Sequence, residues 1–587
     1  MKNIILLILF YCFSLNLSAQ SDYSQFMRIK KLFNQKKYDE LININSTIKN
    51  NSEFYHYTIF YKSVSYYKIN QKEESLKYLN QIRNENPNWS QIDEVYFWIV
   101  KIVSEKNQLK EAMYYFSLVS EEDILSDLYP LIDPLIKKIN SFNQLKKLYE
   151  EYPKNKSIAK YYGRMLLREY LSDEVINKIN KILSIVKKED LFISDNKKFK
   201  IALLLPFMYE GLNNNYYIKN NDFIMDLYAG MLYGLDMYDS INSMIELIAY
   251  DTKRDPEVVR RLTNDGSLDG MNLIIGPLYG KPISIIKQYC LENKILMINP
   301  LSSNNQIIDD NKYSLLYKPS IKTIANKASE YAISKFSNNK NVIIFYEKNY
   351  QDSLIASIYT QRLNDEKFNI IYSKSVSLED SRLILDSLAS TYEEILSDSL
   401  YDTLQYVSGL DIKDGRGIDD LDTTYKYIER FFIEDDSIGH IFVSSKNSLF
   451  ASNVVSAIDI RSDTIPVIGF DDWLDYNVIT VNQFQELNIS LISPSYYNSS
   501  SQEYIEINEY FFKNYSRNVS DNFINGLELI NMIISINENY GNYFQFGLRN
   551  EELISGKISL GAFYKKYNDN QVVPVVRVYE SEIVPIN

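Results

Sequence analysis

The stretch from Lys200 to Pro300 constrains the fold most, because short apolar runs alternate there with segments of helical periodicity. The apolar runs are Ile201–Leu205, Ile245–Ala249, Leu273–Ile275 and Ile295–Ile298. A continuous apolar run is typical of a strand that is buried on both faces, and regular strand–helix alternation predicts a parallel sheet. Ligands of such sheets bind beyond the carboxyl ends of the strands. The loops that follow these runs are therefore the candidate functional segments.

These loops resemble those of the type I periplasmic binding protein family, of the leucine-binding kind. The resemblance is carried by LLPF, AYDTKRDP, IIGPLYG and MINPLSS, each at the end of one run. It continues through YKPS (Tyr317–Ser320), NVIIFYEKNY (Asn341–Tyr350), HIFVSS (His440–Ser445) and VIGFDDW (Val467–Trp473). It covers roughly the last two-thirds of the chain. The resemblance implies two α/β lobes with parallel sheets, three strand crossings between them, and a ligand in the cleft between the lobes.

The resemblance also implies a division of the chain into ranges. The binding fold would span 197–587, with lobe one at about 199–320 and 490–560 and lobe two at about 321–489 and 561–587. Within lobe two, the interval 378–437 is longer than the usual crossover and holds sixteen acidic and five basic residues, a net charge of −11. We expect it to be an acidic insertion that forms a solvated loop. A calcium loop starting at Asp411 is disfavoured, because Lys413 and Gly415 would occupy ligand positions.

Residues 1–20 have the pattern of a secretory signal peptide. Lys2 precedes the apolar run Ile4–Phe13, and small residues lead to Ala19, so cleavage is expected near Ala19 or Gln20. Cys12 lies inside the apolar run rather than at a lipoprotein cleavage site. No later segment has the length of a membrane helix, so no integral membrane segment is expected in the mature chain. The sequence thus predicts a periplasmic protein, with association to the outer membrane left open.

Residues 21–196 show helical periodicity throughout and predict a helical domain. Three polar turns, NQKKY, INQKEE and EKNQLKE, each open a helix that carries Leu41, Ser75 or Ala112 at a comparable place. The spacings of 34 and 37 residues are close to the tetratricopeptide period. The domain resembles tetratricopeptide repeats in a degenerate form, a TPR-like solenoid that lacks the usual Trp, Gly and second Ala. An ordinary helical bundle is the alternative.

Charge and residue types disfavour several classes of function. A net charge of −13 argues against binding nucleic acid or anionic lipid. The two histidines, His56 and His440, fall in different predicted domains, so no zinc cluster or Ser-His-Asp triad is expected. The sequence contains no GxSxG, Walker or GxGxxG motif. We therefore expect no enzyme, no catalytic residue, no metal and no cofactor. Cys290 would be the one cysteine of the mature chain, so no internal disulfide is expected.

The resemblance assigns candidate ligand-binding residues. They are Tyr279, Leu301, Ser302, Ser303, Tyr350 and Asp471. In amino-acid-binding members of the family, hydroxyl and backbone N–H groups of lobe one hold the carboxylate, which falls here to Leu301 and Ser303. An acidic residue of lobe two holds the ammonium, which falls to Asp471, and Tyr350 takes the place of an aromatic cover. Tyr279 replaces a small residue of the family and is bulky enough to fill the pocket.

Two functions of different classes remain open at this point. The first is a binding protein that closes its cleft on a small polar, amino-acid-like ligand for sensing or transport. The second is a regulatory or scaffold protein that binds an envelope protein through the helical domain or the acidic insertion. The order of domains resembles that of LpoA-type activators of a peptidoglycan synthase, which are lipoproteins, whereas this chain lacks their lipobox. Occupancy of the cleft in the purified protein distinguishes the two.

Overall fold

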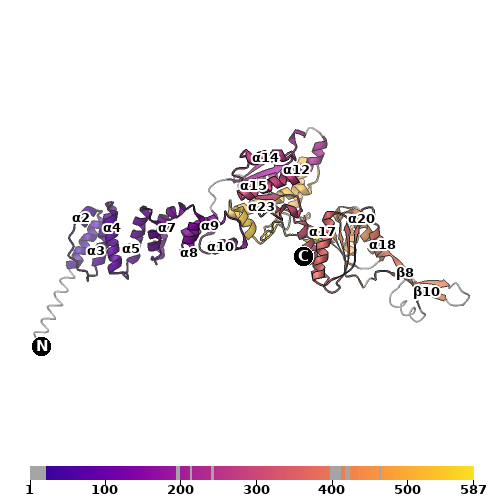
Figure 1. Cartoon of the computed structure of the whole chain (residues 1–587), viewed down its shortest axis with the longest axis horizontal. Coiled ribbons are helices and arrows are strands. Elements are labelled where there is room, and N and C mark those ends of the chain that lie inside the picture. Colours follow the sequence, from indigo (N-terminus) through magenta and orange to yellow (C-terminus); the bar gives the residue numbers. More distant parts are fainter. Residues whose placement is uncertain are drawn as a thin grey trace, which may run out of the picture. The chain divides into compact units, whose positions relative to one another are not determined.

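The computed structural model describes residues 21–192, 198–211, 215–238, 244–396, 412–416, 424–434, 437–461, 465–476 and 478–586 (Figure 1). Contacts between Cα atoms divide the chain into two compact units. Unit one comprises Met1–Leu167 and Asn177–Leu191, and unit two comprises Arg168–Ile176 and Phe192–Asn587. The predicted signal peptide and the predicted domain boundary near Asp195 lie outside the described residues.

Unit one is helical throughout its described residues. Residues 21–34 form its first described helix. The next helices are α2 (Tyr38–Ile42), α3 (Tyr55–Lys68), α4 (Lys72–Glu85), α5 (Ile92–Glu105), α6 (Leu109–Phe116), α7 (Glu122–Lys137), α8 (Phe142–Glu151) and α9 (Lys156–Leu166). Two further helices are shared between the units: α10 (Asp173–Leu183) begins in unit two, and α11 (Lys188–Phe192) ends there with Phe192. Successive helices pack as pairs, with α3 against α4, α5 against α6, and α8 against α9.

The turns between paired helices repeat in their backbone geometry. Lys36, Asn70 and Asn107 have φ values of 58°, 63° and 59°. Each stands two residues before the next helix, at the start of α2, α4 or α6. In each turn the following N–H bonds back to the end of the preceding helix, as Gln71 N does to Tyr66 O (2.8 Å). This bond satisfies a carbonyl group that the helix end would otherwise leave without a partner.

The small or apolar residues that suggested a repeat occupy equivalent positions in the structure. Leu41, Ser75 and Ala112 are each the fourth residue of their helix. All three side chains are buried, with exposed fractions of 2%, 0% and 0%. A buried residue thus recurs at the same place in each of these helices, which explains the period seen in the sequence.

Lobe one of unit two is built on a parallel five-stranded sheet of order β2-β1-β3-β4-β5. The strands are β1 (Phe199–Leu205), β2 (Ile245–Asp251), β3 (Leu273–Ile275), β4 (Leu296–Asn299) and β5 (Ser314–Leu316). All neighbouring strands pair in parallel. The four apolar runs of the sequence are thus strands β1 to β4, as predicted.

Helices from two distant parts of the sequence complete lobe one. They are α12 (Asn215–Asp236), α14 (Pro256–Asn264), α15 (Gly280–Asn293), α22 (Gln502–Tyr515), α23 (Asp521–Tyr540) and α24 (Phe544–Asn550), with the short 3₁₀ turns η1 (Tyr209–Gly211) and η2 (Asn305–Ile307). Asp255 caps α14 as expected, since its side chain accepts a hydrogen bond from Glu257 N (2.9 Å). Helices α12 and α23 pack against each other although they lie about 300 residues apart in the sequence (Figure 1).

Lobe two contains a seven-stranded sheet of order β15-β14-β13-β12-β11-β6-β7. Its strands are β6 (Asn341–Glu347), β7 (Asn369–Val376), β11 (His440–Ser444), β12 (Val467–Phe470), β13 (Ile489–Ile492), β14 (Val575–Tyr579) and β15 (Glu582–Pro585). Strands β7, β6, β11, β12 and β13 run parallel, β14 is antiparallel to β13, and β15 is antiparallel to β14. The buried strands predicted near 341–345, 438–443 and 467–469 are β6, β11 and β12.

Two hydrophobic cores cover the two faces of this sheet. One contains side chains of α16 (Ile321–Lys335) and α17 (Tyr350–Asp365). The other contains side chains of α18 (Leu383–Ala389) and α20 (Ser448–Arg461), together with Phe484 of α21 (Val481–Glu486). Burial on both faces accounts for the continuous apolar character of the central strands.

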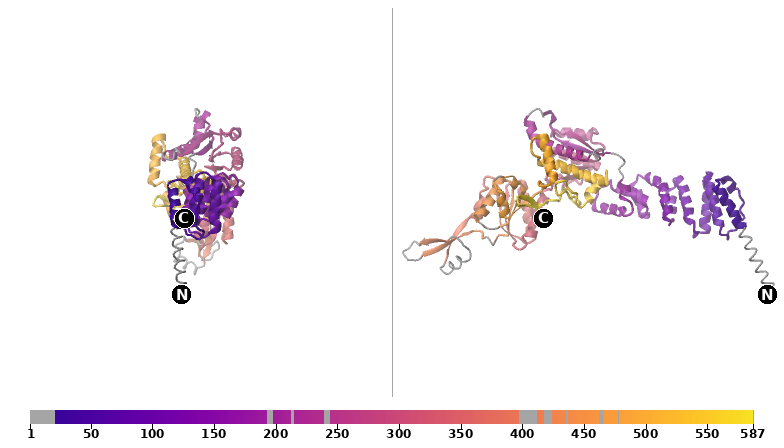
Figure 2. Two further views of the ribbon diagram at one scale, coloured as in Figure 1. Left: turned by 90° about the vertical axis from the view of Figure 1, so that its left-hand side faces the viewer. Right: turned by 180° about the vertical axis from the view of Figure 1, so that it is seen from behind.

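The described part of the acidic interval 378–437 is not the loop that the composition suggested. It contains β8 (Thr391–Leu396), β9 (Ile412–Arg416) and β10 (Thr424–Phe431), which form an antiparallel sheet of order β8-β10-β9. Figures 1 and 2 show β8 and β10 extending away from α18 and α20. The loop expectation was wrong because it weighed charge alone, whereas β-branched and aromatic residues in TYEEIL and TYKYIERF favour strands.

Three segments connect the lobes. They are 317–320, between β5 and α16, 493–501, between β13 and α22, and 551–574, between α24 and β14. The predicted fold class is therefore confirmed: a helical region is followed by two α/β lobes with parallel sheets and three crossings. None of the helices in the described ranges is both long enough and apolar enough to traverse a lipid bilayer.

Candidate functional site

The carboxyl ends of strands from both lobes border one cavity of about 440 Å³ within unit two. Strands β4, β11, β12 and β13 lead directly into loops that line it. The lining side chains include Leu301 and Ser303 from lobe one, Asp352, Lys446, Asp471, Asp472 and Ser493 from lobe two, and Lys318 and Ser495 from the crossings. This is the location at which open α/β sheets bind ligands.

Asn299, the last residue of β4, shapes the lobe-one wall. Its side chain is 1% exposed, and its Nδ2 donates to Pro277 O at 2.9 Å. Its Oδ1 accepts from the backbone N–H groups of Leu301 (3.2 Å) and Ser302 (2.8 Å). Ser302 Oγ in turn accepts from Asn304 N at 3.1 Å. The loop after β4 is therefore held by its own hydrogen bonds, which already use three of its N–H groups.

Asp471, the first residue after β12, forms the lobe-two wall. One of its oxygens accepts from Ser493 Oγ at 2.6 Å. The pKa of Asp471 is raised to about 6, mainly by burial and also by the negative charge of Asp472, whereas the Ser493 hydrogen bond and the charge of Lys446 act in the opposite direction. The carboxylate of Asp471 is thus ionised at neutral pH, and among the described residues it has the nearby charge of Lys446 but no ion-pair partner in direct contact.

Trp473 fixes this loop against the loop after β11. Its indole is fully buried, and Nε1 donates to Ser445 O at 2.9 Å. The ring lies directly over Gly469, where a Cβ atom would come within 2.5 Å of it. This anchoring brings Asp472 to Lys446, whose Nζ lies 2.9 Å from a carboxylate oxygen of Asp472.

Asp352 adds a second buried carboxylate to the same wall. It lies in the first turn of α17 and is 8% exposed. Its oxygens accept from Asn349 Nδ2 (2.7 Å) and Ser444 Oγ (3.3 Å). Burial raises the pKa of Asp352 to about 6, and the negative charge of Glu347 contributes in the same direction.

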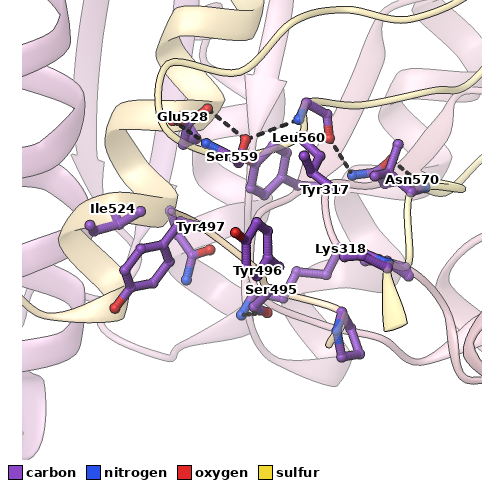
Figure 3. A pocket seen from close by; sticks show the side chains of 16 residues that line it. Tyr317, Lys318, Ser495, Tyr496, Tyr497, Ile524, Glu528, Ser559, Leu560 and Asn570 are labelled. Atoms are coloured by element: carbon purple, nitrogen blue, oxygen red, sulfur yellow. Dashed lines mark hydrogen bonds between the residues drawn. The ribbon is translucent and has the colours of Figure 1, made fainter. Parts of the chain in front are cut away.

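Lys318 lies in the first crossing and borders two cavities. Besides the cleft, it lines a smaller cavity of about 40 Å³ between the three crossings, shown in Figure 3. Its Nζ donates to Ser495 Oγ of the second crossing at 3.3 Å. Burial lowers the pKa of Lys318, although Asp521 and other carboxylates nearby oppose this shift.

The cleft presents both kinds of charge, which suits a ligand that itself carries both. Carboxylates on the lobe-two wall can bind a cationic group, and lysine and hydroxyl groups can bind an anionic group. Among the described residues, no group of three or more His, Cys, Asp or Glu side chains is placed to hold a metal ion.

No model of a known protein family matches the sequence, and no curated protein matches it either. Solved structures with a similar fold were found. A protein described as a branched-chain amino acid ABC transporter from Rhodospirillum rubrum is 8% identical, with a TM-score of 0.46, over 66% of this chain and 100% of its own. An ABC transporter substrate-binding protein from Desulfitobacterium hafniense, in complex with Leu, is 12% identical, with a TM-score of 0.39 and the same coverage of both chains.

A third similar structure extends over nearly the whole chain. Full-length LpoA from Haemophilus influenzae is 10% identical, with a TM-score of 0.43, and the match covers 97% of this chain and 95% of LpoA. The first two matches therefore span about two-thirds of the chain, whereas the third includes its helical region as well.

The structure brings together three of the six predicted site residues. Leu301, Ser303 and Asp471 line the cleft cavity. Tyr350 does not line it, and its side chain is 68% exposed. Tyr279 does not line it either. The ring of Tyr279 instead packs on the guanidinium group of Arg254, which lies 4.9 Å from the ring centroid. Ser302 is likewise absent from the lining, although it is next to two residues that contribute to it.

Sequence reasoning did not single out several residues that the structure places in the cavity. They are Lys318, Asp352, Ser493 and Asp521. Lys318 stands within the YKPS motif and Asp352 follows Tyr350 by two residues, so both lay close to segments already recognised. Only the three-dimensional arrangement shows that their charges face one cavity.

Proposed function

We propose that this chain is a non-enzymatic binding protein that closes its interlobe cleft on a small zwitterionic, amino-acid-like ligand. The observation that carries the proposal is the Asp471 carboxylate, which lines a cavity of about 440 Å³ and has no ion-pair partner among the described residues. A ligand ammonium group bound there would compensate for the burial of this charge.

We further propose that the protein acts in the bacterial cell envelope. Support comes from the signal-peptide pattern of residues 1–20. N-terminal sequencing of the protein recovered from cells tests the location. A chain that begins near Gln20 supports export, and a chain that begins at Met1 contradicts it.

A thermal-shift screen with amino acids and short peptides tests ligand binding. A ligand present at a hundred times its dissociation constant should raise the free energy of unfolding by about 2.7 kcal/mol. Asp471→Asn should abolish that increase, because the ligand ammonium would lose its charged partner. The matched control is Asp309→Asn, since Asp309 is an exposed carboxylate that pairs with Lys322 at 3.1 Å outside the cavity. Ligand binding that survives Asp471→Asn contradicts the assigned role.

A second candidate is regulation of an envelope process, such as peptidoglycan synthesis, through protein contacts. It is favoured by the helical unit, which a transport component does not require, and which exposes Tyr114 beside Tyr115 and Tyr152 in an open groove. The second candidate replaces the first if no small molecule in the screen stabilises the protein and an envelope protein binds reproducibly through the helical domain or the acidic insertion.

A further inference from the structure

Lys318 differs from the other lysine of the cleft in its partners. Lys446 is neutralised by Asp472, at 2.9 Å. Lys318 forms no ion pair with any residue that the structure describes, and its one hydrogen bond is to the Ser495 hydroxyl. Lys318 is also partly buried, whereas the Lys446 side chain is 58% exposed. Carboxylates such as Asp521 lie near the ammonium group, but none of the described ones pairs with it directly, so it can form an ion pair with an anionic group of a ligand.

The loop after β4 offers few alternative donors for an anion. The family resemblance implies that this loop binds a ligand carboxylate through Leu301 and Ser303. The N–H groups of Leu301 and Ser302 instead donate to the Asn299 side chain within the loop. The Ser303 hydroxyl remains at the cavity. A hydroxyl alone is a weaker partner for a carboxylate than a charged donor is.

We propose that Lys318 binds the anionic group of the ligand, and that it makes the cleft selective for ligands that carry a free carboxylate. This inference rests on the function proposed above and assigns its specificity. Asp471 then holds the ammonium group and Lys318 the carboxylate, so recognition uses two opposite charges.

The other carboxylates of the cleft restrict this ligand class further. Asp352, Asp472 and Asp475 also line the cavity, as does Asp521. They repel a purely anionic ligand, so an anion without an ammonium group should bind poorly. Lys318 also links the first crossing to the second through Ser495, so a carboxylate bound by Lys318 would lie next to both of these connecting segments.

The test uses the full-length chain, the twenty amino acids and their α-amides, in which the carboxylate is neutral. In the wild type, any amino acid that binds should bind at least about tenfold more tightly than its amide. Lys318→Met should weaken binding of the free acid by about 30-fold, which is about 2 kcal/mol, and change binding of the amide by less than about threefold. Lys318→Arg keeps the charge and should retain the preference for the acid.

Lys322→Met is the matched control, because Lys322 is an exposed lysine paired with Asp309 outside the cavity. It should leave both affinities unchanged. Equal losses for acid and amide in Lys318→Met would mean that Lys318 has a structural role, and this overturns the inference. If Asp471→Asn abolishes binding of an amino acid and Lys318→Met does not weaken it, the inference about Lys318 is wrong and the proposed function is still supported. If no amino acid binds the wild type, both fail.

Discussion

At the scale of single residues, the cleft combines features that reduce stability with features that suit binding. Asp471 and Asp352 are carboxylates whose pKa values burial raises to about 6, so holding them ionised at neutral pH opposes folding. Buried carboxylates with raised pKa values are typical of binding sites, where a cationic group of the ligand compensates for their negative charge. The unliganded protein is therefore expected to gain stability when one of these charges is removed.

The pH dependence of stability gives a direct test of this at Asp471. Its pKa is 3.8 ordinarily and about 6 in the folded protein, so between pH 4 and pH 6 the folded state holds a proton that the unfolded state has lost. Stability from this group is therefore lost as the pH rises through that window, and stays lost above it. We expect Asp471→Asn to exceed the wild type by about 1–3 kcal/mol at pH 7.5, with the difference vanishing near pH 4.

Urea unfolding of the wild type and of Asp471→Asn across this pH range measures the difference between their free energies of unfolding. Other groups that titrate in this range contribute equally to both proteins, so their contributions cancel in the difference. Asp472→Asn is the control, since it breaks the ion pair with Lys446 and should not stabilise the protein. A stability difference that does not change with pH would show that Asp471 titrates normally.

At the scale of elements, the packing of α12 on α23 depends on glycines. A Cβ atom on Gly526 would lie 2.0 Å from Leu227 O, and one on Gly230 would lie 2.0 Å from Phe523 O. The two helix backbones are thus in contact, and this contact joins an early segment of lobe one to a late one. Glu528, on the same helix α23, accepts hydrogen bonds from the backbone N–H groups of 557–559 and from Ser559 Oγ (Figure 3).

We predict that Gly526→Ala destabilises the protein by about 1–3 kcal/mol, because the backbones must separate to admit a methyl group. The higher helix propensity of alanine, about 1 kcal/mol, offsets only part of this loss. Gly280→Ala in α15 is the matched control, since no atom lies within 4 Å of its added Cβ, and it should change stability by no more than about 1 kcal/mol. Equal effects of the two substitutions in urea unfolding would contradict the close helix contact.

The elements were more accessible to sequence reasoning than the site was. Strands β1 to β4 were predictable because burial on both faces leaves continuous apolar runs. The roles of Tyr350 and Asp352 were not, since they depend on which side of α17 faces the cleft. Residues two positions apart on a helix are separated by about 200° of rotation about its axis. Tyr350 and Asp352 therefore point to nearly opposite sides of α17. Lys318 was missed because the absence of an ion-pair partner is a property of the folded chain alone.

At the scale of the whole molecule, the end of the helical region contributes to the binding fold. Phe192 is 6% exposed and packs in unit two against the rings of Tyr540, Tyr543 and Phe546, with centroids 5.2, 5.9 and 5.5 Å away. Tyr170 contacts the Tyr313 ring at 6.1 Å, also within unit two. The sequence predicts the domain boundary near Asp195, and a fragment that begins there would lack the Tyr170 and Phe192 side chains that pack on lobe one.

We therefore propose that unit two is complete only when it starts at Arg168, and predict that a fragment of residues 198–587 is less stable than one of 168–587. The expected difference in the free energy of unfolding is about 3 kcal/mol, because losing a buried phenylalanine costs about 3–5 kcal/mol and its removal exposes Tyr540 and Phe546. Phe192→Ala in the longer fragment should reproduce most of this loss. Lys294→Met, which breaks only an exposed ion pair with Glu169 at 3.0 Å, should change stability by less than about 1 kcal/mol. If both fragments unfold at the same urea concentration, residues 168–192 do not stabilise the binding fold, and the boundary belongs near Asp195.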